Sequence, residues 1–314
     1  GSIIAGVAGT HDDEELGQIF DPEYLKLQAW KSLGVKGAIS GRSIMSSEQL
    51  KQCLSDNVGE LTFEEAFEKT GRIINIPVTP TEKHQHARLL NYLASPSVLV
   101  PQASLASCAI PGVFPSVTLT ARNYKGEVSE YMPNHKWMDG SLFSDLPMLR
   151  LSRFHNVNHY IVSQTNPHVV PFLDRRKAER RGLAPLARDL VTQSSKQALA
   201  LARHHLGSEG VIAKAHQLAN QKYKGDINIF PKGYTPKKLM SMLSNPTKED
   251  IALYIEEGER HTWPQIERIR NATLISRTFE ACLQRLKEQQ YGARRKDALI
   301  PMMAEAAKRV RRAN

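Results

Sequence analysis

Two stretches decide how this chain is interpreted: Ala106-Ser107-Cys108-Ala109-Ile110-Pro111-Gly112-Val113-Phe114-Pro115, and Trp137-Met138-Asp139-Gly140-Ser141. The first leads from a helix of small residues into a tight loop, because two prolines and a glycine interrupt it. In the second, an aromatic and an apolar residue precede an acid, and the glycine that follows lets other backbone pass close by. Taken alone, Asp139-Gly140 is more typical of a turn.

Helices and strands alternate around these stretches. The clearest helix runs from Leu61 to Thr70, because Thr62 and Glu65 have the spacing of a capping box and Gly71 follows. Further helices are predicted over residues 2–8, 13–33, 47–55, 83–94 and 104–110, the last after a short apolar piece from residue 97, with one more that Asp145 caps. Strands are predicted over residues 72–78, 117–121, 128–132 and 157–164. This alternation up to residue 172 indicates an α/β layer domain.

Composition excludes several classes of protein. The chain has 314 residues, of which 41% are hydrophobic and 24% are charged, so it is long and apolar enough to bury a core. It contains no apolar run of about 18 residues, as a spanning helix would need. Its three cysteines lie far apart in the sequence, which argues against a disulfide framework and favours a reducing compartment.

Charge divides the chain in two. Residues 1–170 hold 14 Lys and Arg against 17 Asp and Glu, whereas residues 171–314 hold 28 against 15. From Phe172 onward, Leu and Ile recur at three- and four-residue intervals among Lys, Arg, Gln and Ala, which predicts helices. A short strand is predicted at residues 227–230 within this part. We therefore expect two domains, residues 1–172 and a basic helical extension over 173–314. The basic part would be attracted to nucleic acid or acidic lipid, unless it is only a set of solvated helix faces.

Motifs for common cofactors are missing from the sequence. It has no GxGxxG, no GxxxxGK[ST], no HExxH and no CxxC, and its paired histidines lack the i, i+4 spacing of metal ligands. No cofactor and no metal are expected. A complete G-x-S-x-G is also missing, since Gly41-Arg42-Ser43-Ile44-Met45 lacks the second glycine. Ser43 is therefore interpreted as an ordinary loop serine.

Several motifs in order resemble the patatin-like lipases, in the branch of fungal and plant triacylglycerol lipases and their bacterial relatives. They are the two stretches quoted first, with Leu61–Ile76, Leu89–Leu99, Asp145-Leu146-Pro147 and Phe154–His168. The resemblance covers residues 1 to about 172 and implies a three-layer α/β fold, a sheet flanked by helices. Two departures stand out: G-x-S-x-G is absent, and the usual Asp-Gly-Gly or Asp-Gly-Ala is here Asp-Gly-Ser.

The resemblance implies a Ser–Asp dyad with Asp139 as the catalytic acid. Gly1 matches the last glycine of G-x-S-x-G, so the serine and the oxyanion loop are expected upstream, the domain is expected to be incomplete at its N-terminus, and this chain alone is expected to be inactive. A cloning remnant is the competing explanation of Gly1-Ser2. Other candidates have simpler interpretations: a helix cap for Asp145, loop residues for Ser141 and Ser144, packing for Ser107 and Cys108, and a shaping loop for Asn166-Pro167-His168.

The expected function is a serine ester hydrolase that acts on acylglycerols or phospholipids. Basic amphipathic helices would suit an intracellular enzyme peripheral to a membrane or lipid droplet. The alternative is a non-catalytic basic module that binds an anionic membrane or nucleic acid. Nucleic acid is not the expected partner, because no RNP, zinc-finger or helix-turn-helix signature accompanies the charge.

Overall fold

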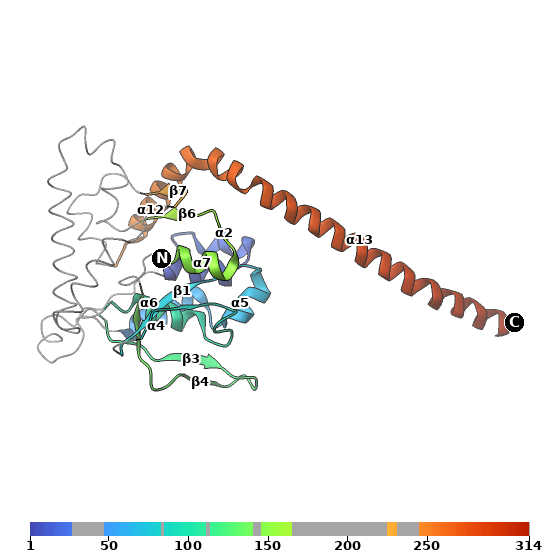
Figure 1. Ribbon diagram of the computed structural model, residues 1–314, viewed down its shortest axis with the longest axis horizontal. Helices are drawn as coiled ribbons and strands as arrows, with labels where there is room; N and C mark the ends of the chain where they lie inside the picture. The colour runs from blue at the N-terminus through green and yellow to red at the C-terminus, as the bar shows by residue number, and fades with distance from the viewer. Residues whose placement is uncertain are drawn as a thin grey trace, which may run out of the picture. The chain divides into compact units, whose positions relative to one another are not determined.

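The computed structural model describes residues 1–26, 47–82, 85–110, 114–140, 146–164, 225–230 and 245–313, with the backbone alone from residue 291. These residues form helices and small sheets, a mixed α/β architecture (Figure 1). The chain divides into two compact units, Gly1–His261 and Thr262–Asn314.

Within the described ranges, six helices of the first unit lie in the first half of the chain. They are α1 (Ser2–Thr10), α2 (Asp13–Ile19), α4 (Ser47–Val58), α5 (Phe63–Thr70), α6 (Val100–Cys108) and α7 (Met148–His155). The predictions for α1, α4, α5 and α6 are confirmed. The helix predicted over 13–33 is too long, because α2 ends at Ile19 and Pro22 follows in a turn. Its remainder from residue 27 lies outside the described residues.

Helix α5 has both predicted caps. The Thr62 side chain accepts a hydrogen bond from the Glu65 N–H at 3.2 Å, and the Glu65 carboxylate accepts one from the Thr62 N–H at 2.8 Å. Gly71 ends the helix in the left-handed conformation, with φ 68°. The same carboxylate also accepts hydrogen bonds from Arg122 at 2.5 and 2.7 Å. The cap therefore ties α5 to strand β3 (Leu119–Arg122).

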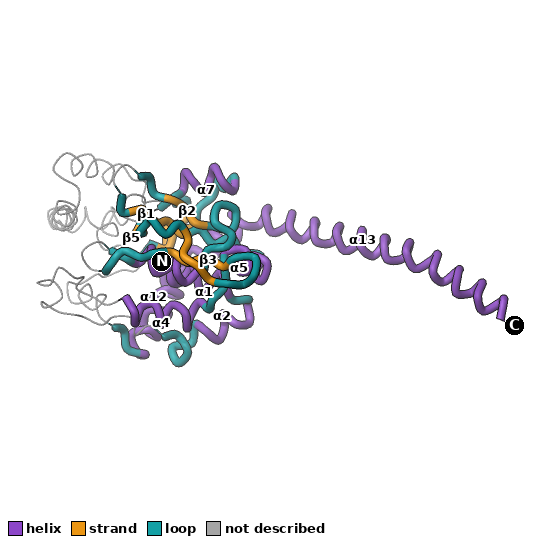
Figure 2. Tube along the Cα trace, turned by 90° about the horizontal axis from the view of Figure 1, so that it is seen from below, coloured by secondary structure: helices purple, strands orange, loops and turns teal. Residues whose placement is uncertain are grey.

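Three antiparallel strands form the sheet that positions the site. Strand β1 (Ile76–Pro80) lies between β2 (Arg88–Leu90) and β5 (Trp137–Asp139). In Figure 2 these strands lie between α7 and the helices α1 and α4. The helix predicted over 83–94 is wrong, because residues 88–90 form β2. Leu89 and Leu90 are buried there, and Leu90 pairs with Ile76, so sheet pairing prevails over local helix propensity.

The other sheets have two strands each. Strand β3 pairs antiparallel with β4 (Val128–Tyr131), which confirms the predicted strand pair. Strand β6 (Ile161–Ser163) pairs in parallel with β7 (Ile227–Ile229). The strand predicted over 157–164 is shorter than expected and only half-buried, since Val162 is buried while Ile161 is exposed. Helix α7 begins at Met148 after Pro147, so Asp145 is not its N-cap as predicted; Asp145 itself lies outside the described residues.

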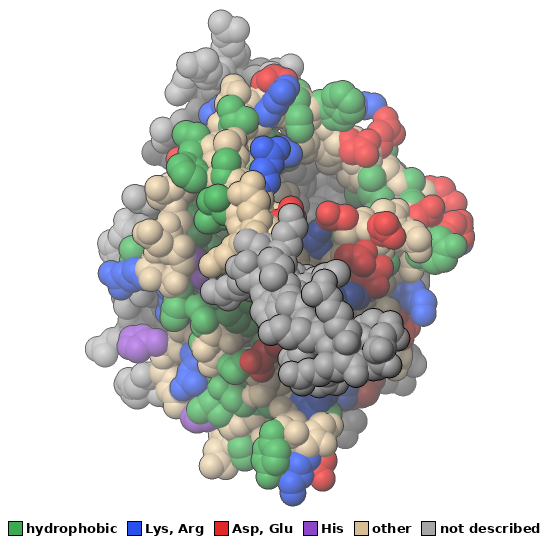
Figure 3. All heavy atoms as spheres, turned by 90° about the vertical axis from the view of Figure 1, so that its right-hand side faces the viewer, with side chains coloured by type: hydrophobic (Ala, Val, Ile, Leu, Met, Phe, Trp, Pro, Cys, Tyr) green, Lys and Arg blue, Asp and Glu red, His purple; other side chains and the backbone are tan. Residues whose placement is uncertain are grey.

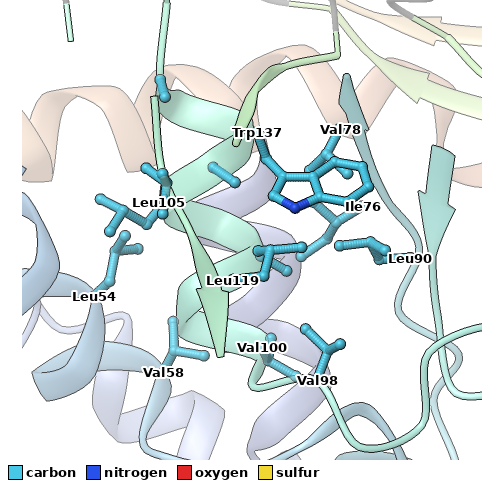
Figure 4. Packing of buried hydrophobic residues seen from close by; sticks show 14 of the residues in the cluster. Leu54, Val58, Ile76, Val78, Leu90, Val98, Val100, Leu105, Leu119 and Trp137 are labelled. Atoms are coloured by element: carbon cyan, nitrogen blue, oxygen red, sulfur yellow. The ribbon is translucent and has the colours of Figure 1, made fainter. Parts of the chain in front are cut away.

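One hydrophobic core holds the helices against the three-stranded sheet. Trp137 of β5 is fully buried, and Figure 4 shows its ring among side chains of β1, β2 and β3. Helices α4 and α6 close the other side of this core with Leu54, Val58 and Leu105. The indole gives the core its largest fully buried side chain. Burial of this kind is the main favourable contribution to the stability of the unit.

Helices dominate the described C-terminal residues, as predicted. They are α12 (Lys248–Thr262), the short 3-10 helix η1 (Trp263–Gln265) and α13 (Ile266–Ala313). The predicted helices between residues 173 and 224 lie outside the described residues. No helix in the described part of the chain is long and apolar enough to cross a membrane.

Gly140, which follows β5, passes close to the backbone of β1. A Cβ atom at this position would lie 2.6 Å from the Pro77 carbonyl carbon and 2.8 Å from the Val78 nitrogen. Both are backbone atoms, so the clash cannot be relieved by a rotamer change. Any side chain at residue 140 would therefore force the two strands apart.

We expect Gly140→Ala to lower the free energy of unfolding by about 2 to 3 kcal/mol, because backbone must move to admit the methyl group. Gly258→Ala is the control, since nothing lies within 4 Å of a Cβ at this exposed position in α12. Urea unfolding of both variants makes the comparison. Equal stability of the two variants would contradict the close approach.

The Glu65 cap should make stability depend on pH. Burial acts to raise the pKa of Glu65, but hydrogen bonds from the Thr62 N–H and Arg122 outweigh it and lower the pKa overall. The stabilisation is therefore complete above the ordinary Glu pKa and is lost as the pH falls through the lowered one. Glu65→Gln should cost about 1 kcal/mol at neutral pH, given the screening of a partly exposed carboxylate, and less at about pH 3.

Urea unfolding of wild type and Glu65→Gln at both pH values tests this expectation. Glu64→Gln neutralises an exposed carboxyl in the same turn of α5 and is the control. A cost for Glu65→Gln that is as large in acid as at neutral pH would show that the carboxylate charge is not what stabilises the helix start.

Candidate active site around Asp139

Asp139 is the last residue of β5, so the turn interpretation of Asp139-Gly140 does not describe its setting. It pairs with Val78 of β1, and its N–H donates a hydrogen bond to the Ala109 carbonyl oxygen at 3.1 Å. These contacts fix its backbone from two sides. The residue is 9% exposed, which leaves the carboxylate in a largely water-excluded setting.

The N-terminal end of α1 and the C-terminal end of α6 meet next to this strand. The Ser2 hydroxyl and the Cys108 thiol are 3.4 Å apart, and the Ser104 hydroxyl donates to the Ser2 carbonyl oxygen at 3.3 Å. Helix α6 also packs against β5, with Ala109 accepting the bond from Asp139. Helix α6 therefore connects the beginning of α1 to the acid.

The pKa of Cys108 depends on the same groups. Burial raises the pKa of the Cys108 thiol. The Asp139 carboxylate raises this pKa further, whereas the hydrogen bond with Ser2 and the amino group of Gly1 lower it. One thiol thus interacts with both the acid and the first residues of α1. The thiol lies in the space that these two groups share.

Small residues allow the helices to approach closely. A Cβ on Gly6 of α1 would lie 3.1 Å from the Ser104 hydroxyl of α6 and 3.3 Å from Val58. A Cβ on Gly9 would lie 2.1 Å from the Ile74 side chain. The small residues Gly6 and Ser104 therefore allow α1 and α6 to pack closely.

Sequence reasoning missed two features of the site. Cys108 was interpreted as a packing residue, and nothing in its local sequence indicates the contact with Ser2 across 106 positions. Thr79 of β1 lies opposite Met138, and its buried hydroxyl has no hydrogen-bond partner within the described ranges. Thr79 directly follows Val78, the residue that pairs with Asp139, and its unsatisfied hydroxyl can be found only from the three-dimensional structure.

Several predicted residues lie outside the described residues, so their places are not given by the structure: Ser43, Ser141, Ser144, Asp145 and Asn166-Pro167-His168. Among the described residues, no group of three or more His, Cys, Asp or Glu side chains could hold a metal ion. A cavity of about 370 Å³ lies elsewhere, between α4 and α12, and its lining includes Leu25, Cys53 and Ile251 but not Asp139.

Surface charge follows the division expected from the sequence. On the face shown in Figure 3, acidic side chains gather toward one edge. The first turn of α2 alone contributes Asp13, Glu14 and Glu15, in keeping with the acidic excess of residues 1–170. The part of the chain that carries Asp139 is therefore not itself a basic surface.

Comparison with known proteins identifies the family. Residues 1–151 match the model of the patatin-like phospholipases. Triacylglycerol lipase SDP1L of Arabidopsis thaliana is 32% identical over 307 residues, which cover 90% of this chain and 37% of the plant protein. Triacylglycerol lipase 4 of Saccharomyces cerevisiae is 32% identical over 301 residues, covering 86% and 33%.

A patatin-like phospholipase domain-containing protein of Aspergillus clavatus is 30% identical over 329 residues and extends over 97% of this chain and 45% of its own length. The chain thus spans between a third and a half of the length of these relatives. The order of motifs, the buried acid at the end of β5 and these matches agree. Through residues 1–151, this chain belongs to the patatin-like phospholipase family.

Proposed function

We propose that this chain is part of a serine ester hydrolase that uses Asp139 as the base of a Ser–Asp dyad. The observation that supports it is the placement of buried Asp139, whose N–H donates to Ala109, directly after the Cys108 thiol that contacts the Ser2 hydroxyl of α1. In this proposal the serine belongs to a segment that joins α1 at Gly1, so its hydroxyl would lie within hydrogen-bond reach of the Asp139 carboxylate.

The chemistry of the dyad needs a base that water does not surround. The serine oxygen attacks the ester carbonyl carbon, and its proton passes to the Asp139 carboxylate. When the carbon–oxygen bond to the alcohol breaks, the protonated Asp139 returns that proton to the departing oxygen. Water then cleaves the acyl-enzyme, with Asp139 again accepting and returning a proton. Low exposure of Asp139 favours each transfer, because an exposed Asp with a pKa near 3.9 is a weak base.

The proposed substrates are acylglycerols or phospholipids, and the proposed location is an intracellular membrane or lipid-droplet surface. Relatives named triacylglycerol lipases support the acylglycerol substrate. The basic excess of residues 171–314 supports attraction to an anionic lipid surface. The non-catalytic alternative gains no specific observation from the described residues.

The proposed domain organisation follows from the same interpretation. Residues 1–172 would form the hydrolase core, in which the three-stranded sheet belongs to a layer flanked by helices. Residues 173–314 would form the basic helical extension. The antiparallel sheet β2-β1-β5, with α6 packed against β1 and β5 and α1 packed against α6, supports a layered core.

We expect Asp139→Asn to lower ester hydrolysis at least about 1,000-fold in protein that carries the serine-bearing segment ahead of Gly1, because the amide cannot accept the serine proton. The measurement is kcat on a soluble p-nitrophenyl ester. Asp56→Asn is the matched control and should retain activity, because it changes an acid on α4 that pairs with Lys26.

The 314-residue chain on its own should not turn over the same ester. A fluorophosphonate probe should label the extended protein at the serine and leave the 314-residue chain unlabelled. Turnover by the 314-residue chain that Asp139→Ala abolishes would contradict the position of the nucleophile. Full activity of Asp139→Asn in the extended protein would contradict the role of the acid.

A further inference from the structure

Helix α13 has an apolar face that the described residues leave uncovered. The face consists of Ile275, Phe279, Cys282, Leu283 and Leu286, which recur at intervals of three and four residues and so lie on one side of the helix. Ile275 is 69% exposed and Phe279 is 66% exposed. Every residue from 274 to 290 is exposed. A single helix cannot bury such a face against itself, so the face requires a partner.

Charge indicates which partner fits this face. Residues 266–314 hold 12 Lys and Arg against 5 Asp and Glu. A second copy of α13 would bring two basic helices together, at an electrostatic cost. An anionic lipid surface would instead attract the basic residues while its acyl boundary accepts the apolar side chains.

The width of the face leads to the same partner. Two-stranded coiled coils use a narrow seam of two positions in seven. Here Cys282 and Leu283 are adjacent and flank the line through Phe279 and Leu286, so the face is wider than such a seam. A broad apolar face opposite basic side chains such as Arg277 is typical of a helix that lies in a membrane interface.

We propose that α13 lies along the surface of anionic phospholipid membranes, with the apolar face of Ile275, Phe279, Cys282, Leu283 and Leu286 inserted at the acyl boundary. This inference deepens, and rests on, the proposed function at a lipid surface. The helix would hold the hydrolase at the interface where its substrate is found. Its role is binding, and no residue of α13 takes part in the chemistry.

Leu274 provides a matched control within the same helix. It is 56% exposed, close to the 60% of Leu286. Leu274 and Phe279 are five positions apart in the sequence, which places the two side chains about 140° apart around the helix axis. Leu274→Ser and Leu286→Ser therefore make the same chemical change at similar exposure, but only the second changes the apolar face.

The test is sedimentation of the full chain with sucrose-loaded vesicles of phosphatidylcholine, with or without about 30% phosphatidylserine. Wild type should bind the vesicles that contain phosphatidylserine, and added salt should weaken this binding. Leu286→Ser should weaken it about tenfold, because one buried Leu is lost from the bilayer. Leu274→Ser should bind like wild type.

A fluorescent probe on Cys282 reports insertion directly. Cys282 is exposed, whereas Cys53 is buried with its pKa raised to about 11 by desolvation, and burial also raises the pKa of Cys108. A maleimide derivative of the environment-sensitive dye NBD should therefore react at Cys282 first. Its emission should shift to shorter wavelength on vesicles with phosphatidylserine. The same dye on Leu274→Cys in a Cys282→Ser background should shift little.

Three outcomes would overturn the proposal. These are absence of vesicle binding, equal loss of binding in Leu274→Ser and Leu286→Ser, and a stable dimer that Leu286→Ser dissociates without any effect on vesicles. The dimer is detected by light scattering and would assign the face to a second copy. Asp139→Asn should leave vesicle binding unchanged, and Leu286→Ser should leave hydrolysis of a soluble ester unchanged. Failure of the membrane inference is thereby distinguished from failure of the hydrolase proposal.

Discussion

The contact between β5 and β1 determines where the acid of this protein lies. Gly140 passes against the backbone of Pro77 and Val78 so closely that no side chain fits, and the ladder places Asp139 opposite Val78. The fully buried Trp137 anchors the same strand in the core. The position of Asp139 is therefore fixed by backbone contact and by packing together.

Helix α6 connects Asp139 to the beginning of the chain. Ala109 accepts the hydrogen bond from Asp139, and the preceding Cys108 contacts Ser2, as does Ser104 one turn before Cys108. The small residues of α6 are what permit α1 to approach this closely. The same residues that look unremarkable in the sequence thus bring together two segments that are more than 100 positions apart.

Much of this arrangement could be predicted from sequence where the signal is local. The capping box of Thr62 and Glu65 and the hairpin around Gly126 follow from spacing alone and are confirmed. The role of Asp139 is implied by resemblance to a family and stays a prediction. Strand β2 could not be predicted, because its Leu-rich sequence favours a helix until Ile76 pairs with Leu90. The contact between Ser2 and Cys108 depends on long-range packing, whereas the exposure of the apolar face of α13 depends on the absence of such packing. Sequence periodicity alone predicts neither.

The central claim is that Asp139 faces a serine joined to the beginning of α1, and one distance tests it most directly. An experimental structure of the protein that includes the segment preceding Gly1 gives the separation between the Asp139 carboxylate and that serine oxygen. The account predicts a direct hydrogen bond of about 2.6 to 3.2 Å. A carboxylate that points into solvent, too far from the serine for one hydrogen bond or one bridging water, would contradict it.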